Sequence, residues 1–146
     1  MDALDLTKKP PRSPWVKIGG AYMLARTIDK LRAKLPGGNV GLYRIAPGFS
    51  ERLLAAIGCS EEELSDAVAR AKSDDDVVAW VERRADKARL EKFNEAVSKR
   101  RIMDVDDVAA FKERYPVIVE KGFPDDTVLF DLLDKDDAII FAATPR

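Results

Sequence analysis

The sequence contains no histidine, a single cysteine and no long apolar run. Without histidine the chain lacks the side chain that most often acts as a general base near neutral pH and most often binds a metal. Every serine or cysteine triad built on an imidazole is excluded as well. Cys59 alone cannot form an internal disulfide, and a zinc site would have to rely on carboxylates. We therefore expect no metal and no cofactor, and we assign no catalytic residue.

The lack of long apolar runs and the single cysteine also indicate where in the cell the protein is found. No apolar stretch approaches the ~20 residues that a membrane-spanning helix needs. The first residues, "MDALDLTKKPP", lack the apolar segment of a secretory signal. A lone cysteine suits a reducing compartment. These features predict a cytoplasmic protein that has no membrane partner.

Charge is present in both signs but is unevenly distributed. The chain has 146 residues and a net charge of −1. Residues 1–47 hold nine Lys and Arg against three Asp and Glu, whereas the remainder holds sixteen against twenty-three. The basic first third could face a nucleic acid, or it could pack against the acidic remainder. We favour packing because the totals nearly cancel and no long basic run exists.

The opening stretch "TKKPPRSPWVKIGG" (residues 7–20) is rich in proline and shows no helical periodicity. Pro10, Pro11 and Pro14 fix their own φ and bias the residues before them toward extended geometry. Trp15 would gain a few kcal/mol by leaving water. We therefore expect residues 1–20 to form an extended strap, held on the body of the protein by a buried Trp15.

Apolar residues recur at helical spacing through most of the remaining chain. The pattern predicts helices over 21–35 and 50–58, one from Ser60, two within 74–101, one from Asp104 to Pro116, and one from Asp125 or Asp126 through Leu133. Residues 74–101 contain neither Gly nor Pro, so a single rod of ~42 Å is the alternative there. We favour two helices that meet near 87–90, because the rod would overshoot a domain of this size.

Several helix ends carry specific signals. Ser60 and Glu63 have the spacing of a capping box, and Cys59 can pack on Leu64 as a hydrophobic staple. Three glutamates follow Cys59, which argues against a reactive thiol. The aspartates at 74–76 suit the first turn of a helix, where the helix dipole favours negative charge.

Three short segments, 40–46, 116–120 and 138–143, have strand-like composition. The predicted fold is thus mainly α: a single domain over 1–146, built as an orthogonal bundle of about six helices. The strap covers 1–20 and the helical body covers 21–146. The three segments add at most a minor two- or three-stranded element.

Both ends of the chain resemble a known family. "LDLTKKPPRSPWVKIGG", "ARTIDKLRAKLPG" and "FDLLDKDDAIIF" are similar to the opening and closing signatures of the bacterial family called domain of unknown function 5069. The likeness is strongest in the first 50 and the last 20 residues. The resemblance implies no activity.

Two candidate sites involve the strap. Gly19 and Gly20 precede the first helix, whose free N–H groups favour an anion, and Arg12 and Arg26 could converge there. The alternative is a simple turn, because the sequence lacks a phosphate-loop motif.

The second candidate is a structural polar network, in which acidic residues near the C-terminus receive the strap's cations. Its members would be Lys8, Arg12, Asp29, Lys30, Asp131 and Asp134. The last two could instead bind Mg²⁺, although no acidic cluster in the chain fits an EF-hand loop.

We interpret the protein as a non-catalytic binding or interaction module. Its partner is unknown, and a protein partner or a second copy of the chain are both open. One alternative is a small histidine-free enzyme acting on a phosphorylated or carboxylated metabolite, using side chains such as Tyr22, Tyr43 and Arg44. The other is a nucleic-acid-binding protein. We do not expect nucleic acid, because acidic residues interleave with the basic patch at 83–92.

Overall fold

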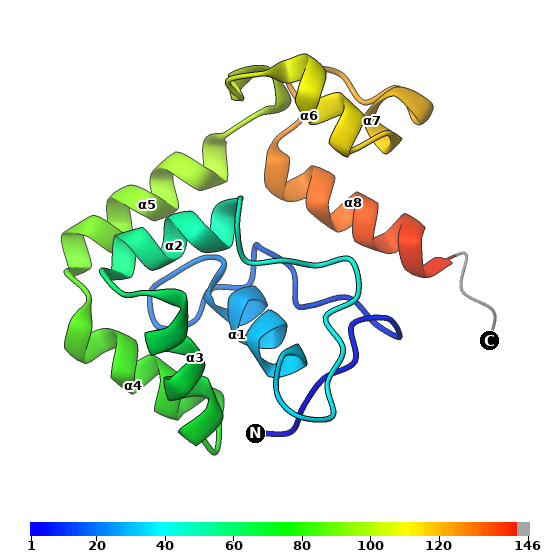
Figure 1. Ribbon diagram of the computed structural model, residues 1–146. Coiled ribbons are helices and arrows are strands. Elements are labelled where there is room, and N and C mark those ends of the chain that lie inside the picture. Colours follow the sequence, from blue (N-terminus) through cyan, green and yellow to red (C-terminus); the bar gives the residue numbers. More distant parts are fainter. Residues whose placement is uncertain (143–146) are drawn as a thin grey trace. The chain divides into compact units, whose positions relative to one another are not determined.

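The structure is a computed structural model and describes residues 1–142. Within those residues the protein is mainly helical, as predicted, with eight α-helices, one short 3-10 helix and three isolated β-bridges in place of a sheet (Figure 1). The chain divides into two compact units, Met1–Asn94 and Glu95–Arg146. The single domain over 1–146 remains a prediction.

The first unit is built around α1. Its helices are α1 (Leu24–Ala33), α2 (Phe49–Ile57), α3 (Glu61–Arg70), α4 (Asp74–Arg84) and the first part of α5 (Lys87–Lys99). Helix α1 packs against α2 and α3, and nine of its ten residues are buried. Leu24, Ile28 and Leu53 are fully buried in this core. Each such side chain contributes about 1.5–3 kcal/mol.

Helix α1 begins three residues later than the pattern predicts. Met23, just before the helix, has φ 70°, in the left-handed region. Ile18 and Ala21 pair through main-chain hydrogen bonds in both directions, so Ala21 belongs to a turn. The turn contains Gly19 and Gly20, both with positive φ, which glycine adopts at little cost.

The strap is held against α1 by backbone bonds and buried prolines. Leu4 N–H donates to Arg32 O of α1 at 3.3 Å, and Leu6 N–H donates to Asn39 O, just after α1, at 2.8 Å. The Leu6 side chain is 2% exposed. Pro11 and Pro14 are buried. The prediction that Trp15 is the buried anchor is wrong, because Trp15 is 36% exposed. The buried residues of the strap are Leu6, Pro11 and Pro14 instead.

Residues 74–101 form two helices, which confirms that prediction. The break falls at Ala85, whose ψ of 145° is extended, slightly before the predicted junction. Asp86 then accepts a bond from the main-chain N–H of Arg89 and caps α5. The first backbone N–H groups of a helix have no partner within the helix. An aspartate cap accepts a hydrogen bond from one of them and so favours the start of a new helix at this position.

The second unit contains elements whose bounds differ from the predicted ones. They are the 3-10 helix η1 (Ile102–Asp104), α6 (Val108–Arg114), α7 (Val117–Glu120) and α8 (Leu129–Ala142). The predicted cap at Asp104 is wrong, because Asp107 caps α6 by accepting the N–H of Ala110. The last helix begins at Leu129 rather than at 125 or 126. Main-chain bonds from Ile102 to Thr127 and from Leu129 to Arg100 join the ends of α5 and α8.

None of the three strand-like segments forms a strand within the described residues. Residues 40–46 form a loop, 116–120 lie mostly in α7, and 138–142 continue α8; residue 143 lies outside the described range. Ile45, Val117 and Ile118 are buried, whereas Leu42, Val119 and Ile139 are exposed. Local β-propensity therefore does not decide the structure of these segments. No helix in residues 1–142 has the length and apolar character needed to span a membrane.

Candidate functional site

The strap's Arg12 lies at the centre of an ion cluster inside the first unit. Asp29 of α1 accepts from the Arg12 main-chain N–H at 2.8 Å and from Nε and Nη2 at 3.1 Å. Asp74 at the start of α4 accepts from Nη1 at 2.7 Å and from Nη2 at 3.0 Å. Arg12 lowers the pKa of Asp74 below its usual value, chiefly through these bonds. The guanidinium is therefore bound by two carboxylates.

The residues of the predicted anion site lie in one region but are used by protein contacts. Asn94 of α5 donates from Nδ2 to Gly20 O at 2.7 Å, and its Oδ1 accepts the main-chain N–H of Tyr22 at 2.9 Å. These two hydrogen bonds stabilise the Gly19–Gly20 turn. Arg26 is 2% exposed, and its Nη1 donates to Arg12 O at 3.2 Å. Because Arg12 is already neutralised, this geometry favours a structural turn over an anion pocket.

The remaining members of the predicted polar network are spread over both units. Lys8 is exposed in the strap. Lys30 is 8% exposed, and its Nζ donates to Arg44 O at 3.0 Å. Asp131 and Asp134 lie on α8 in the second unit. Their meeting with the strap stays a prediction, whereas Arg12 and Asp29 are directly bonded.

Lys30 also bears on the enzyme hypothesis. Its Nζ lies 3.3 Å from Ser50 Oγ, the atoms of a Ser–Lys nucleophile pair. However, Ser50 is 1% exposed, and its Oγ shares a hydrogen bond of 2.9 Å with Thr27 Oγ1. A nucleophile must reach its substrate, so we interpret this cluster as buried polar packing.

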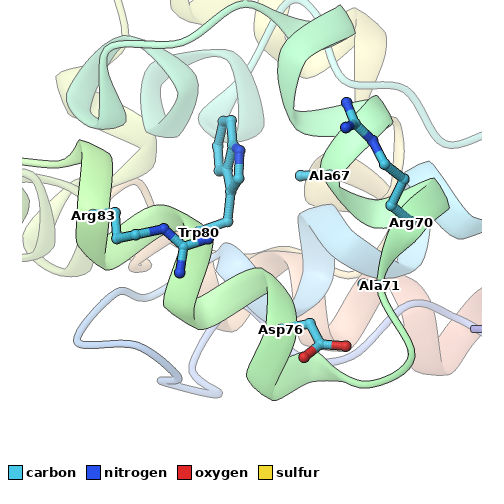
Figure 2. Close-up of a pocket in the computed structure, with 6 residues that line it drawn as sticks. All are labelled: Ala67, Arg70, Ala71, Asp76, Trp80 and Arg83. Carbon is cyan, nitrogen blue, oxygen red and sulfur yellow. The ribbon is translucent and has the colours of Figure 1, made fainter.

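An open groove of about 200 Å³ lies between α3 and α4 (Figure 2). Its lining residues are Ala67, Arg70, Ala71, Asp76, Trp80 and Arg83. Two alanines on the α3 side leave room beside the Trp80 ring, which is half-buried. Figure 2 shows Arg70 and Arg83 on either side of Trp80. The groove thus places the Trp80 ring and two alanines between two cationic side chains.

The Trp80 ring is held by a chain of contacts that starts at the α3 cap. Glu63 accepts the N–H of Ser60 at 3.0 Å in the capping box, and its other oxygen pairs with Arg84. The Arg84 guanidinium lies 4.9 Å from the centre of the Trp80 ring, at cation–π distance. The Ser60 N–H, followed by Arg84, lowers the pKa of Glu63, so the carboxylate stays charged. One wall of the groove is thereby fixed in place.

The two flanking arginines are available to a ligand. Both Arg70 and Arg83 are exposed, and neither forms an ion pair with any carboxylate in residues 1–142. Asp76 accepts the main-chain N–H of Lys72 at 2.8 Å, which closes the turn between the two helices. A guanidinium can bind a carboxylate or a phosphate through two parallel hydrogen bonds.

Sequence reasoning missed this groove. It placed Arg83 in a basic patch interleaved with acidic residues and assigned Trp80 no functional role. A signal was present: Glu63, Ala67 and Arg70 share one helix face, as do Asp76, Trp80 and Arg83. What the spacing could not show is that these two faces pack against each other. Within residues 1–142 no cluster of three or more acidic or Cys side chains is placed to hold a metal ion.

The fold and groove define a mainly helical protein with a shallow cationic groove between two helices. The chain belongs to the family described as domain of unknown function, DUF5069, whose sequence model matches residues 8–139. This confirms the resemblance that the two ends of the chain predict. No curated protein matches the chain.

Proposed function

We propose that this protein is a non-catalytic binding module and that the groove between α3 and α4 receives an anionic group of its ligand. The observation that carries the proposal is that Arg70 and Arg83, which form no ion pair within residues 1–142, lie beside the ring of Trp80. Such an arrangement recognises a carboxylate or a phosphate attached to a compact apolar group. The single cysteine supports a reducing compartment, the cytoplasm, as part of the same proposal.

The groove supports this reading better than the two alternatives. A nucleic acid would meet unfavourable charge, because residues 60–84 contain eight acidic and four basic side chains. An enzyme would need a reactive group beside the ligand. The groove offers arginines, an indole and one carboxylate, which suit binding more than bond making or breaking.

Fluorescence of Trp80 tests the proposal directly. In a Trp15→Phe background, Trp80 is the only tryptophan that emits. We expect 3-phenylpropionate to shift this emission with saturation, and the neutral 3-phenylpropanamide to have no effect. Arg70→Ala and Arg83→Ala should each weaken binding up to about fivefold, since an exposed ion pair contributes up to ~1 kcal/mol.

Arg52→Ala is the matched control, because Arg52 is an exposed arginine on α2 that does not line the groove. It should bind 3-phenylpropionate as the Trp15→Phe parent does. The proposal is wrong if the amide binds as well as the acid, or if all three arginine variants behave alike.

A further inference from the structure

The size of the groove limits what can occupy it. Its volume of about 200 Å³ lies below the ~300–1,000 Å³ of sites that enclose small-molecule ligands. It is open to solvent rather than enclosed. A free small molecule would keep much of its surface in water there. One side chain of a longer segment would fill the space, while its neighbours made further contacts along α3 and α4.

The charges select among such segments. Arg70 is the last residue of α3, next to the interhelical turn, whereas Arg83 lies near the far end of α4. Each guanidinium can receive one carboxylate. The surrounding helices are acidic overall, with Glu62, Asp66 and Glu82 exposed. A long run of negative charge would be repelled, so one or two carboxylates placed beside the arginines fit best.

We infer that the groove binds a short segment of a partner protein in which one apolar side chain is flanked by carboxylates. The apolar side chain lies against Trp80 and Ala67, and the carboxylates bind Arg70 and Arg83. This inference rests on the proposed function and names the partner of the same site. Fixing of the Trp80 ring by Arg84 lowers the ordering cost of binding, since the wall is formed in advance.

Fluorescence anisotropy with labelled dodecapeptides tests the inference. The main probe has one phenylalanine between two glutamates in a serine–glycine background. The matched probes replace both glutamates by glutamine, or the phenylalanine by serine. A hexaglutamate peptide and a twelve-nucleotide oligothymidine complete the set. We expect the main probe to bind at least tenfold tighter than every other peptide and than 3-phenylpropionate.

Protein variants locate the binding. Arg70→Ala and Arg83→Ala should each weaken the main probe severalfold, and Arg52→Ala should leave it unchanged. Ala67→Leu fills the floor without changing charge and should also weaken binding severalfold. The thermal midpoint of each variant verifies that it is folded, so that Ala67→Leu and the arginine variants can be interpreted separately.

The possible outcomes separate the two proposals. If 3-phenylpropionate binds through the arginines but no peptide binds tighter, the inference fails and the proposed function stands. If hexaglutamate or oligothymidine binds best, the inference fails in favour of a polyanion. If neither 3-phenylpropionate nor any peptide binds, both proposals fail.

Discussion

Arg12 binds Asp29 twice over, through its main-chain N–H at 2.8 Å and through its guanidinium at 3.1 Å. The same guanidinium binds Asp74, the first residue of α4. One side chain therefore ties the strap to α1 and to the start of the helix that carries Trp80. Asp74 lies two residues before Asp76, which lines the groove. The strap contributes in this way to holding one wall of the candidate site.

Removing the Arg12 side chain should destabilise the first unit. Arg12→Ala leaves Asp29, whose side chain is 7% exposed, without its main partner. Losing one partner of a buried pair costs up to ~5 kcal/mol, and because Arg12 is itself one-third exposed we expect about 1–3 kcal/mol. Urea denaturation measures this change in the free energy of unfolding.

Lys99→Ala is the matched control for Arg12→Ala. The Lys99–Glu95 pair is 73% and 70% exposed, so its loss should cost at most ~0.5 kcal/mol. Equal effects of the two substitutions would show that the Arg12 cluster does not hold the strap.

Acid should weaken the contact between the strap and α4. Arg12 holds the pKa of Asp74 below the ordinary value of 3.8. A carboxylate whose pKa is lower in the folded state than in the unfolded state stabilises the folded protein. This stabilisation is fully present at pH values above the unfolded-state pKa, and it is lost as the pH falls through the folded-state pKa. Asp74→Asn should therefore reduce the loss of stability between pH 6 and pH 3. Urea denaturation at the two pH values measures it.

Asp66→Asn provides the comparison for that experiment. Asp66 is an exposed aspartate of α3 with no bonding partner in residues 1–142. The free energy of unfolding should therefore fall more between pH 6 and pH 3 in Asp66→Asn than in Asp74→Asn. The same difference in both variants would contradict the role of Asp74.

The two serine N-caps of the groove helices should differ in strength. Ser60 accepts the N–H of Glu63 at 3.1 Å, whereas Ser73 makes no side-chain cap bond. Ser60→Ala should lower the free energy of unfolding by about 1 kcal/mol, and Ser73→Ala by clearly less. Thermal or urea denaturation of the two variants distinguishes them. A larger cost at Ser73 would contradict the capping geometry.

Cys59 should react slowly with thiol reagents in the folded protein. Burial raises the pKa of its thiol, and Glu63 raises it further, although Arg84 acts in the opposite direction. Because the thiolate is the reactive form, modification by a disulfide reagent at pH 7.5 should be on the order of tenfold slower than in urea-unfolded chain. Equal rates in the two states would show that Cys59 is not protected.

Local signals predicted much of the helical architecture. The capping box at Ser60–Glu63 and the glycine that ends α2 at Gly58 are both present. The break within 74–101 was predicted from length, and Asp86 supplies its local cause. These features depend on residues within one helical turn of each other, so sequence spacing is enough to identify them.

Features that depend on distant partners were missed. Trp15 was expected to be buried on grounds of size, but the buried residues of the strap are Leu6, Pro11 and Pro14. Residues 138–142 have a β-prone composition, yet they continue α8. Propensity describes a segment alone, whereas burial and secondary structure at such positions depend on what packs against them.

The sequence by itself determined a mainly helical, histidine-free chain, its main helix caps and its family. Only the tertiary structure decided that Arg12 binds Asp74, 62 residues away, and that the faces of Ala67 and Trp80 form one groove. Caps and periodicity are set by neighbours along the chain. Ion pairs and grooves are set by which helix faces meet, and that choice depends on the packing of the whole unit.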